Sequence, residues 1–277
     1  MNDRPTLVVV ASDGHCNSMA GLCPPVFRYG DGGEYRASPR QVMLWKYWRE
    51  LAAEMRQRAQ ELKARLVVIY DGDGPDRNKY ADGYGLITMR RDEVVRLTVQ
   101  ALTPLREVAD VYVTNRGTQA HEGGSGELAE MVAERLDSLP NPETGEFSWY
   151  WPKLDIDGVL CEFGHCPPSN STKEHLRGAG ARRTAFELEA AYNRMGDKLP
   201  QVAVFAHVHH YEDSGTNYSI RVLFTAAWKL PEAYSYDRGF GFKREPLMAW
   251  YWVCQDGQMS DPRRWERMMP GPKVVTL

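Results

Sequence analysis

The sequence of 277 residues predicts an α/β fold with a largely parallel sheet. Three observations support this prediction. Short apolar runs alternate with segments of helical spacing, each apolar run ends in a cluster of polar or glycine residues, and hydrophobic residues make up 43% of the chain, as in ordinary globular proteins. Strands that alternate with helices form largely parallel sheets, and ligands bind at the carboxyl ends of such strands. The polar clusters are therefore expected to share one end of one sheet.

Five apolar runs have the length and composition of strands that are buried on both faces. These runs are Leu7–Ala11, Arg65–Tyr70, Ala109–Val113, Gly158–Phe163 and Gln201–Ala206. Four segments carry apolar residues at helical spacing. These segments run from Ser38 to about Ala64, from about Arg91 to Val108, from Glu127 to Leu136 and from Ala181 to Met195. Ser38 precedes Pro39, an arrangement typical of a helix N-terminus.

The remaining segments are expected to be loops or additional strands of one domain spanning residues 1–277. A stretch rich in glycine and proline separates the first strand from the first helix. Residues 137–156, with several prolines and a run of aromatic residues, are expected to form an excursion. Tyr218–Thr225 and Leu247–Cys254 are expected to be antiparallel strands of a C-terminal part, about residues 212–277, that completes a second sheet.

The composition excludes some classes of protein. The formal net charge is −3 and the sequence pI is about 6.2, so no global basic field attracts nucleic acid, which leaves only a local basic groove for such a partner. No run reaches the ~20 apolar residues of a transmembrane helix, and the N-terminus does not resemble a signal peptide. Sequence motifs of phosphate-binding loops, zinc proteases and nucleophile elbows are absent.

The cysteines favour a cytoplasmic protein with reduced thiols. There are five of them, an odd number, and no secretory signal accompanies them. An alternative interpretation is that four of them bind a structural zinc ion: Cys16, Cys23, Cys161 and Cys166. These four lack the Cys-x-x-Cys spacing of such sites, so buried or bystander thiols are favoured.

Five of the seven histidines lie in the polar clusters that end the predicted strands. They are His15, His121, His165, His207 and His209. Asp13 stands two residues before His15, and His207 stands two residues before His209. Residues i and i+2 of an extended chain share a face, so both side chains of each pair can reach one ion.

Asp73 extends this pattern, because it follows Gly72 and a carboxylate can bridge two cations whereas an imidazole cannot. A mixed set of nitrogen and oxygen ligands suits Mn, Fe, Zn or Ni better than Ca or Mg. Two such cations at roughly 3.5–4 Å would clamp a phosphate and activate a water molecule between them. The alternative for these residues is turn and capping chemistry, since Asp commonly bonds to local backbone after a strand. Their joint pattern favours two divalent metal ions.

The order of these motifs resembles that of the calcineurin-like metallophosphoesterases, which is Asp-x-His, Gly-Asp-x-x-Asp, Gly-Asn-His-Asp/Glu, His and Gly-His-x-His. Here it stands as Asp13-Gly14-His15, Gly72-Asp73-Gly74-Pro75-Asp76, Gly117-Thr118-Gln119-Ala120-His121-Glu122, His165 and Ala206-His207-Val208-His209. The resemblance extends from about Leu7 to Tyr211. It is greatest with a branch found in phages and prophages, in which a Gly-Thr-x-x-His form replaces Gly-Asn-His. It implies a four-layer α/β/β/α sandwich with a mixed, largely parallel sheet.

The resemblance also implies which residues hold the metals. The first metal would take Asp13, His15 and His209, Asp73 would bridge the two metals, and the second metal would take His165, His207 and Thr118. Thr118 stands where the family has an asparagine, and a neutral hydroxyl is a weak ligand. Asn115, three residues earlier, is the alternative.

By the same resemblance, a hydroxide between the two cations would attack the phosphorus of a phosphate ester. His121 would assist the leaving oxygen, and Glu122 would orient the His121 imidazole. Asp76 is expected to be a turn residue or a partner of these groups.

Two groups of residues are candidates for binding the substrate. Arg177, Arg182 and Arg183 would hold phosphate, the alternative being a solvated helix start. Residues 149–151, Trp-Tyr-Trp, would stack on bases, the alternative being a packing anchor. A phosphodiester of a nucleotide or of DNA is favoured over a monoester, partly because the phage-like branch is nuclease-like. Two rivals stay open: a non-catalytic binding or structural protein that retains the fold, and a nucleic-acid-binding accessory factor.

Overall fold

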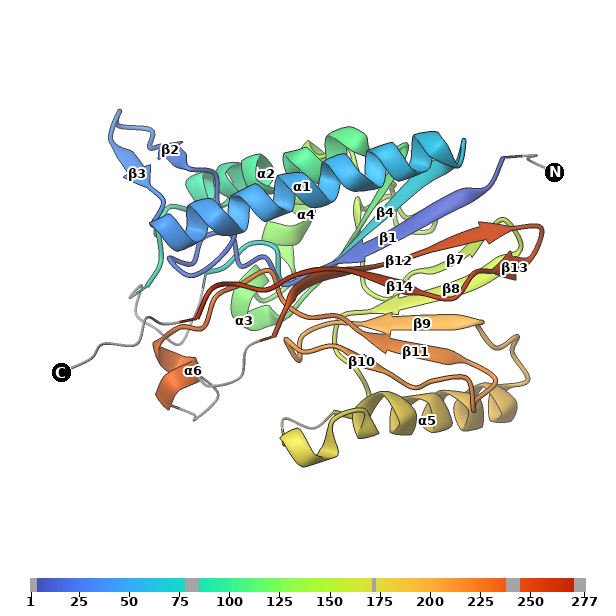
Figure 1. Ribbon diagram of the computed structural model, residues 1–277. Coiled ribbons are helices and arrows are strands. Elements are labelled where there is room, and N and C mark those ends of the chain that lie inside the picture. Colours follow the sequence, from blue (N-terminus) through green and yellow to red (C-terminus); the bar gives the residue numbers. More distant parts are fainter. Residues whose placement is uncertain (1–3, 78–84, 171–172, 238–244, 272–277) are drawn as a thin grey trace.

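Two β-sheets lie face to face, and helices cover the outer face of each sheet (Figure 1). The computed structural model describes residues 4–77, 85–170, 173–237 and 245–271. Clusters of buried apolar side chains fill the space between successive layers. The predicted four-layer α/β/β/α sandwich is confirmed, and parallel strands occupy the middle of both sheets.

The first sheet is built around the N-terminal strand, in the order β13-β12-β1-β4-β5-β6, with β14 also on β12. Its strands are β1 (Thr6–Ala11), β4 (Arg65–Asp71), β5 (Val111–Asn115), β6 (Ser148–Trp149), β12 (Leu247–Gln255), β13 (Gln258–Met259) and β14 (Arg263–Arg267). β1, β4 and β5 pair in parallel, whereas β12 pairs antiparallel with β1. Parallel pairing brings the carboxyl ends of β1, β4 and β5 to one edge.

The continuous apolar run of β1 reflects burial on both faces. Leu7 and Val9 pack against the helices on the outer face of the first sheet. Val8 and Val10 point the other way and pack between the two sheets. Since successive side chains of a strand alternate between faces, a strand with two buried faces needs apolar residues at every position.

The second sheet has the order β10-β11-β9-β8-β7. Its strands are β7 (Lys153–Ile156), β8 (Val159–Gly164), β9 (Val202–Phe205), β10 (Glu212–Asp213) and β11 (Arg221–Phe224). β8, β9 and β11 pair in parallel, and the two outer strands pair antiparallel with their neighbours. The carboxyl ends of β8 and β9 therefore share one edge of this sheet.

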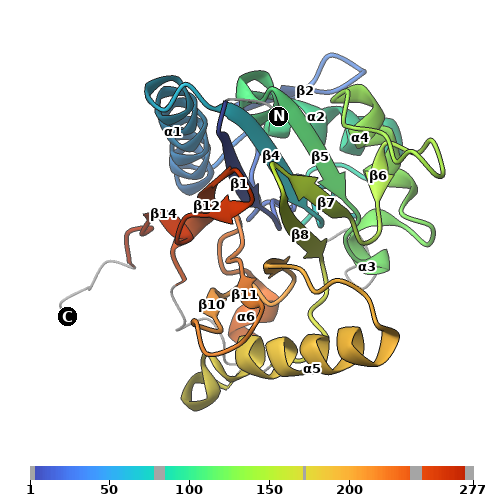
Figure 2. The same cartoon turned by 90° about the vertical axis from the view of Figure 1, so that its right-hand side faces the viewer.

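Four long helices form the outer layers: α1 (Pro39–Glu61), α2 (Arg91–Val108), α4 (Glu127–Arg135) and α5 (Ala179–Met195). The first three cover the first sheet, and α5 covers the second (Figure 2). Ser38 caps α1 as predicted, because its hydroxyl accepts from Gln41 N while the Gln41 side chain accepts from Ser38 N.

Four predicted helices and five predicted strands are confirmed, but three expectations about their arrangement are wrong. The five strands do not form one sheet: β1, β4 and β5 lie in the first sheet and β8 and β9 in the second. The expected excursion, residues 137–156, contributes β6 to the first sheet and β7 to the second. In the C-terminal part, β11 is parallel to β9, and β12 joins the first sheet. Apolar periodicity identifies a strand but not the partner beside which it lies.

Several short elements were not predicted. β2 (Val26–Arg28) and β3 (Glu34–Arg36) form a hairpin in the stretch expected to be a loop. α3 (Gln119–Glu122), α6 (Ala233–Asp237) and the 3-10 helix η1 (Glu174–Leu176) are each about one turn long. Elements this short have too few residues to show a periodic pattern.

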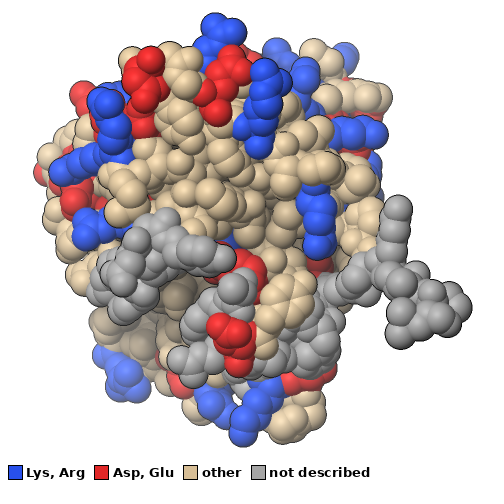
Figure 3. All heavy atoms as spheres, turned by 90° about the vertical axis from the view of Figure 1, so that its left-hand side faces the viewer, with Lys and Arg blue, Asp and Glu red and all other residues tan. Residues whose placement is uncertain are grey.

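Within the ranges that the structure describes, no helix is both long enough and apolar enough to cross a membrane. The five cysteines are free thiols, of which four are buried and Cys166 is exposed. Figure 3 shows the face toward which β1, β4, β8 and β9 point. Lys and Arg side chains are spread over its upper part and lower edge together with Asp and Glu, so the part of this face that can be described carries both signs of charge.

Candidate metal centre

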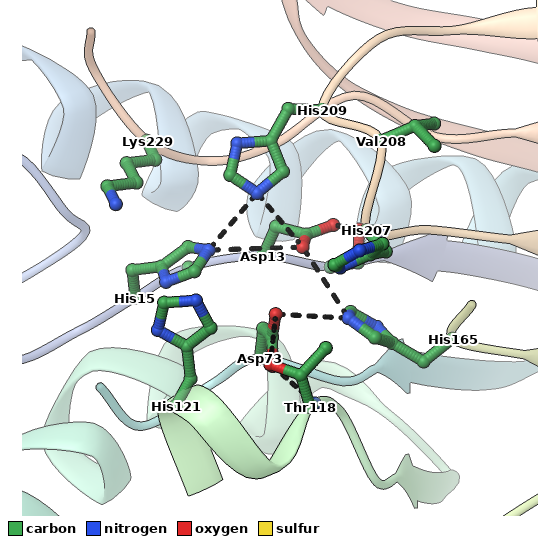
Figure 4. A network of polar contacts seen from close by, with 12 residues as sticks. Asp13, His15, Asp73, Thr118, His121, His165, His207, Val208, His209 and Lys229 are labelled. Carbon is green, nitrogen blue, oxygen red and sulfur yellow. Dashed lines mark hydrogen bonds and ion pairs between the residues drawn. The ribbon is translucent and has the colours of Figure 1, made fainter. Parts of the chain in front are cut away.

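The polar residues that follow five parallel strands meet where the edges of the two sheets adjoin (Figure 4). Asp13 and His15 follow β1, Asp73 and Asp76 follow β4, Thr118 and His121 follow β5, His165 follows β8, and His207 and His209 follow β9. Ligand-forming atoms approach within 4.8 Å of one another in several groups of three, including Asp13–His15–His209 and Asp13–Asp73–His165. The structure thus brings together every histidine and aspartate that the sequence predicted as a metal ligand.

The backbone at these positions is left-handed, not extended. Positive φ angles occur at Asp13 (53°), His15 (42°), Asp73 (49°), His207 (67°) and His209 (58°). The i, i+2 argument from an extended strand is therefore wrong, although its conclusion that the paired side chains converge holds. Left-handed conformation costs a non-glycine residue about 1–2 kcal/mol. Five of the nine such residues in the described chain belong to this centre, and strain of this kind collects at functional sites.

Two glycines permit the loops to pack this closely. A Cβ on Gly72 would lie 2.4 Å from His165 Nδ1, and one on Gly117 would lie 2.2 Å from the Asp73 backbone nitrogen. Contacts under 3.0 Å do not occur between real atoms of this kind. Both glycines therefore leave space into which Asp73 and His165 fit.

The first group of ligand atoms is centred on His209. Its Nε2 lies 3.3 Å from Asp13 Oδ1 and 3.2 Å from His15 Nε2. Burial, together with the positive charge of Lys229, lowers the pKa of His15 to about 4. His15 is therefore a neutral imidazole at neutral pH, the form in which histidine binds a metal.

The second group is centred on His165, which lies at the junction of the two sheets. Its Nδ1 contacts the Asp71 carbonyl oxygen at 2.7 Å and must be the donor in that contact, which leaves the Nε2 lone pair on the other side of the ring. Nε2 lies 3.1 Å from Asp73 Oδ2 and 3.9 Å from Asp13 Oδ1.

These buried atoms fit a cation. Asp13 Oδ1 and His165 Nε2 are fully buried and form no hydrogen bond with any described residue. A lone pair that faces carboxylate oxygens is stable only if a proton or a cation lies between them. Burial lowers the pKa of His165, but the Asp73 and Asp13 carboxylates outweigh burial and raise it well above its usual value. The site therefore attracts positive charge, and its nitrogen and oxygen donors suit a divalent transition metal.

His121 is oriented by Asp76, not by Glu122. His121 Nδ1 lies 2.9 Å from Asp76 Oδ1, and the rings of His121 and His15 are 4.4 Å apart. Glu122 points elsewhere and accepts a hydrogen bond from Gly117 N at 2.6 Å. The predicted pairing of Glu122 with His121 is wrong, because both lie on α3 and adjacent residues of a helix do not face each other.

Two further buried carboxyls line the same region. Burial raises the pKa of Asp71 to about 7. Burial and the Asp73 carboxylate raise the pKa of Glu122 to about 8. The carboxyl groups of Asp71 and Glu122 can therefore be uncharged at neutral pH. The negative charge around Asp73 then comes from the carboxylates that face the ligand nitrogens.

Thr118 and Asn115, the two candidates for the remaining ligand of the second metal, are placed differently. Thr118 donates to Asp73 Oδ1 through its backbone nitrogen (2.7 Å) and its hydroxyl (3.0 Å). Asn115 Nδ2 donates to Asp71 Oδ1 at 2.6 Å, and Asn115 Oδ1 accepts from Arg116 N at 3.1 Å. Both ends of the Asn115 amide are thus bonded away from Asp73, whereas the Thr118 hydroxyl faces it.

Two residues of the centre were not predicted from the sequence. Cys166 forms a group with His165 and His207 in which the ligand-forming atoms lie within 4.8 Å of one another. Lys229 lies beside His15 (Figure 4), and its Nζ contacts Glu232 Oε1 at 2.7 Å. No motif surrounds Lys229, so only the fold reveals it. Cys166 directly follows the predicted ligand His165 in the sequence, and this position could have indicated that it belongs to the centre.

The arginines predicted to hold phosphate lie in other surroundings. Arg177 Nε contacts Glu174 at 2.8 Å, and its Nη1 contacts Glu245 at 3.1 Å. Phosphate binding by Arg177 would require these ion pairs to open. Arg182 and Arg183 are exposed near the start of α5. Trp151 packs against Gly164 and Phe205, which agrees with the alternative of a packing anchor for this ring.

Comparisons with known proteins show likeness in structure only. No family model and no curated protein matches the sequence. Among solved structures, Vps29 of Chaetomium thermophilum is 11% identical with a TM-score of 0.40, over 96% of this chain and 100% of that one. The hypothetical protein PH1004 of Pyrococcus horikoshii OT3 is 12% identical with a TM-score of 0.41, over 94% of this chain and 87% of that one. Likeness this low carries no argument about the chemistry of this protein.

Proposed function

We propose that this protein is a metal-dependent phosphoesterase of the calcineurin-like type that binds two divalent cations and acts on a phosphodiester. The observation that carries the proposal is the convergence of Asp13, Asp73 and His165 at one point, with left-handed backbone at the two aspartates and with buried ligand atoms, Asp13 Oδ1 and His165 Nε2, that lack hydrogen bonds. Strained ligands around unsatisfied buried atoms are poor for stability alone and are explained by cation binding.

In this proposal, one set of residues would bind the cations and another would transfer a proton. Asp13, His15 and His209 would hold one cation, and Asp73, His165 and His207 would hold the other. When bound, two cations neutralise the charge of the phosphate and lower the pKa of a water molecule. Asp76 fixes the Nδ1 side of His121, so Nε2 is left to hold a proton for the leaving oxygen.

The charge state of His121 supports its role as an acid. Burial lowers the pKa of His121, but the hydrogen bond with Asp76 and the Asp73 carboxylate outweigh burial and raise it. A raised pKa keeps the imidazole protonated closer to neutral pH, where it can donate to a departing oxygen. His121 is 22% exposed at its side chain, so a substrate can reach it.

A diester is favoured over a monoester because, among the residues that the structure describes, the centre has few cationic side chains that are not already paired. Arg177 is paired with two glutamates, and Lys229 is paired with Glu232. A phosphate monoester carries nearly two negative charges at neutral pH, whereas a diester carries one. The natural substrate would be a nucleotide or DNA, and the cytoplasm would be its compartment.

The test is hydrolysis of bis-p-nitrophenyl phosphate with added Mn²⁺, together with the metal content of the protein. We expect about two bound cations per chain and hydrolysis that chelation abolishes and Mn²⁺ restores. His207→Ala is expected to lose both hydrolysis and part of the bound metal. A wild-type protein that binds metal without hydrolysing any diester or monoester would leave a binding protein as the better explanation.

Replacement of His121 by alanine separates proton transfer from metal binding. We expect kcat to fall by about 10²–10³-fold while the metal content stays unchanged, because general acids contribute roughly that much and the ligand sets proposed for the two cations do not include His121. His175→Ala is the matched control, since His175 is exposed on η1. Equal loss of metal and activity in His121→Ala would show that His121 is a ligand instead.

A further inference from the structure

The second cation of the proposed centre lacks an obvious complete set of ligands. Asp73 and His165 meet at 3.1 Å, and His207 lies beside His165 with 5.5 Å between the ring centroids. The residue at the family's asparagine position is Thr118, whose hydroxyl already donates to Asp73. Asn115 is bonded to Asp71 and to the backbone of the next residue. Neither candidate predicted from the sequence supplies a strong ligand.

Cys166 lies close to both histidines of this group. It follows His165 directly after β8, and its sulfur lies within 4.8 Å of ligand nitrogens of both His165 and His207. Cys166 is exposed, whereas the other four cysteines are buried among apolar side chains. Because the Cys166 side chain is exposed, its thiol does not serve to fill the apolar core.

A second observation points to a ligand here, independently of the thiol. His165 is 3% exposed, and its Nε2 forms no hydrogen bond with a described residue. His165 Nδ1 is engaged by the Asp71 carbonyl, so only Nε2 is available to a ligand. The same histidine belongs to the group with Asp13 and Asp73 and to the group with Cys166 and His207.

We infer that the Cys166 thiolate is a ligand of the second cation, alongside Asp73, His165 and His207, and that this cation is zinc or iron. Four donors from one sulfur, two nitrogens and one oxygen form a set typical of a tetrahedral ion with ligand distances of about 2.0–2.3 Å. A thiolate favours zinc and iron, whereas manganese and magnesium favour oxygen. This inference rests on the proposed two-metal function and deepens it by naming the ligand and the class of ion.

Cobalt substitution tests the inference without any measurement of activity. The wild-type protein, stripped with chelator and loaded with two equivalents of Co²⁺, is expected to show a near-ultraviolet thiolate-to-cobalt charge-transfer band. Cys166→Ser is expected to lose the band and to weaken binding of the second ion by at least about 100-fold, since even partners of a metal ligand contribute 10–100-fold. Cys161→Ala, which removes a buried thiol of β8 that faces the core between the sheets, is expected to keep the band.

Alkylation of the native protein gives a second readout that needs no variant. Iodoacetamide is expected to modify Cys166 in the metal-free protein and to leave it unmodified once two equivalents of Zn²⁺ are bound, as located by mass spectrometry. Two bound ions with no charge-transfer band and with Cys166 still reactive would overturn the cysteine assignment and leave the proposed function standing. A wild-type protein that binds no divalent ion would overturn both.

Discussion

Asp73→Asn is expected to reduce kcat for bis-p-nitrophenyl phosphate by at least about 10³-fold. Asp73 Oδ1 accepts two hydrogen bonds from Thr118, and Oδ2 lies 3.1 Å from His165 Nε2, so the carboxylate belongs to the group of metal-binding atoms that also contains Asp13 and His165. Asparagine keeps the shape but removes the charge that a bridging ligand supplies. Metal ions contribute several kcal/mol to such a reaction, and about 4 kcal/mol corresponds to roughly 10³-fold.

Asp256→Asn is the matched control for this substitution. Asp256 has the same left-handed backbone (φ 51°) but lies exposed in the turn between β12 and β13. It should retain full activity and metal content. Activity in Asp73→Asn within about tenfold of the wild type, with two metals still bound, would rule out a bridging role for Asp73.

Gly72→Ala is expected to lower the free energy of unfolding of the protein by about 2–5 kcal/mol. Gly72 has a φ of 80°, a conformation that costs a residue with a side chain about 1–2 kcal/mol. The added Cβ would also meet His165 Nδ1 at 2.4 Å, and overpacking of a buried site costs a further 1–3 kcal/mol or so. Urea unfolding followed by circular dichroism measures the difference.

Gly145→Ala separates the cost of the left-handed backbone from the cost of the close contact with His165. Gly145 has a φ of 75°, and an added Cβ there would meet no atom within 4 Å. It should therefore show only the backbone cost of about 1–2 kcal/mol. If the two alanine variants lost equal stability, the close contact between Gly72 and His165 would have no energetic consequence. Since His165 must move to admit the methyl group, Gly72→Ala is also expected to bind less metal.

Local patterns in the sequence predicted most elements well. α1 begins after Ser38, as the Ser-Pro pair indicated, and α2 has the bounds expected from its apolar spacing. The run from Leu7 to Ala11 predicted a strand buried on both faces, and the structure buries every residue of it. Such features depend on neighbouring residues in the chain, which is why the chain alone reveals them.

Long-range arrangement was predicted less well. The Trp149 segment lies beside β5, whereas β7, a few residues later, lies beside β8 in the other sheet. The Leu247–Gln255 strand returns to β1 after more than 200 residues. Pairing of strands depends on which surfaces are left to bury once the rest of the chain has folded, and no local spacing records that choice.

The sequence by itself determined the identity of the aspartates and histidines that gather at the strand ends, because parallel strands with polar termini must present those termini at a common edge. Only the tertiary structure decided how these side chains meet. The fold places the backbone of Asp13, His15 and Asp73 in left-handed conformations. It pairs His121 with Asp76 and not with Glu122. It also brings Lys229 and Cys166 to the centre. Those contacts join residues that are distant in the chain or lie in turns, and their geometry depends on the packing of two sheets against each other.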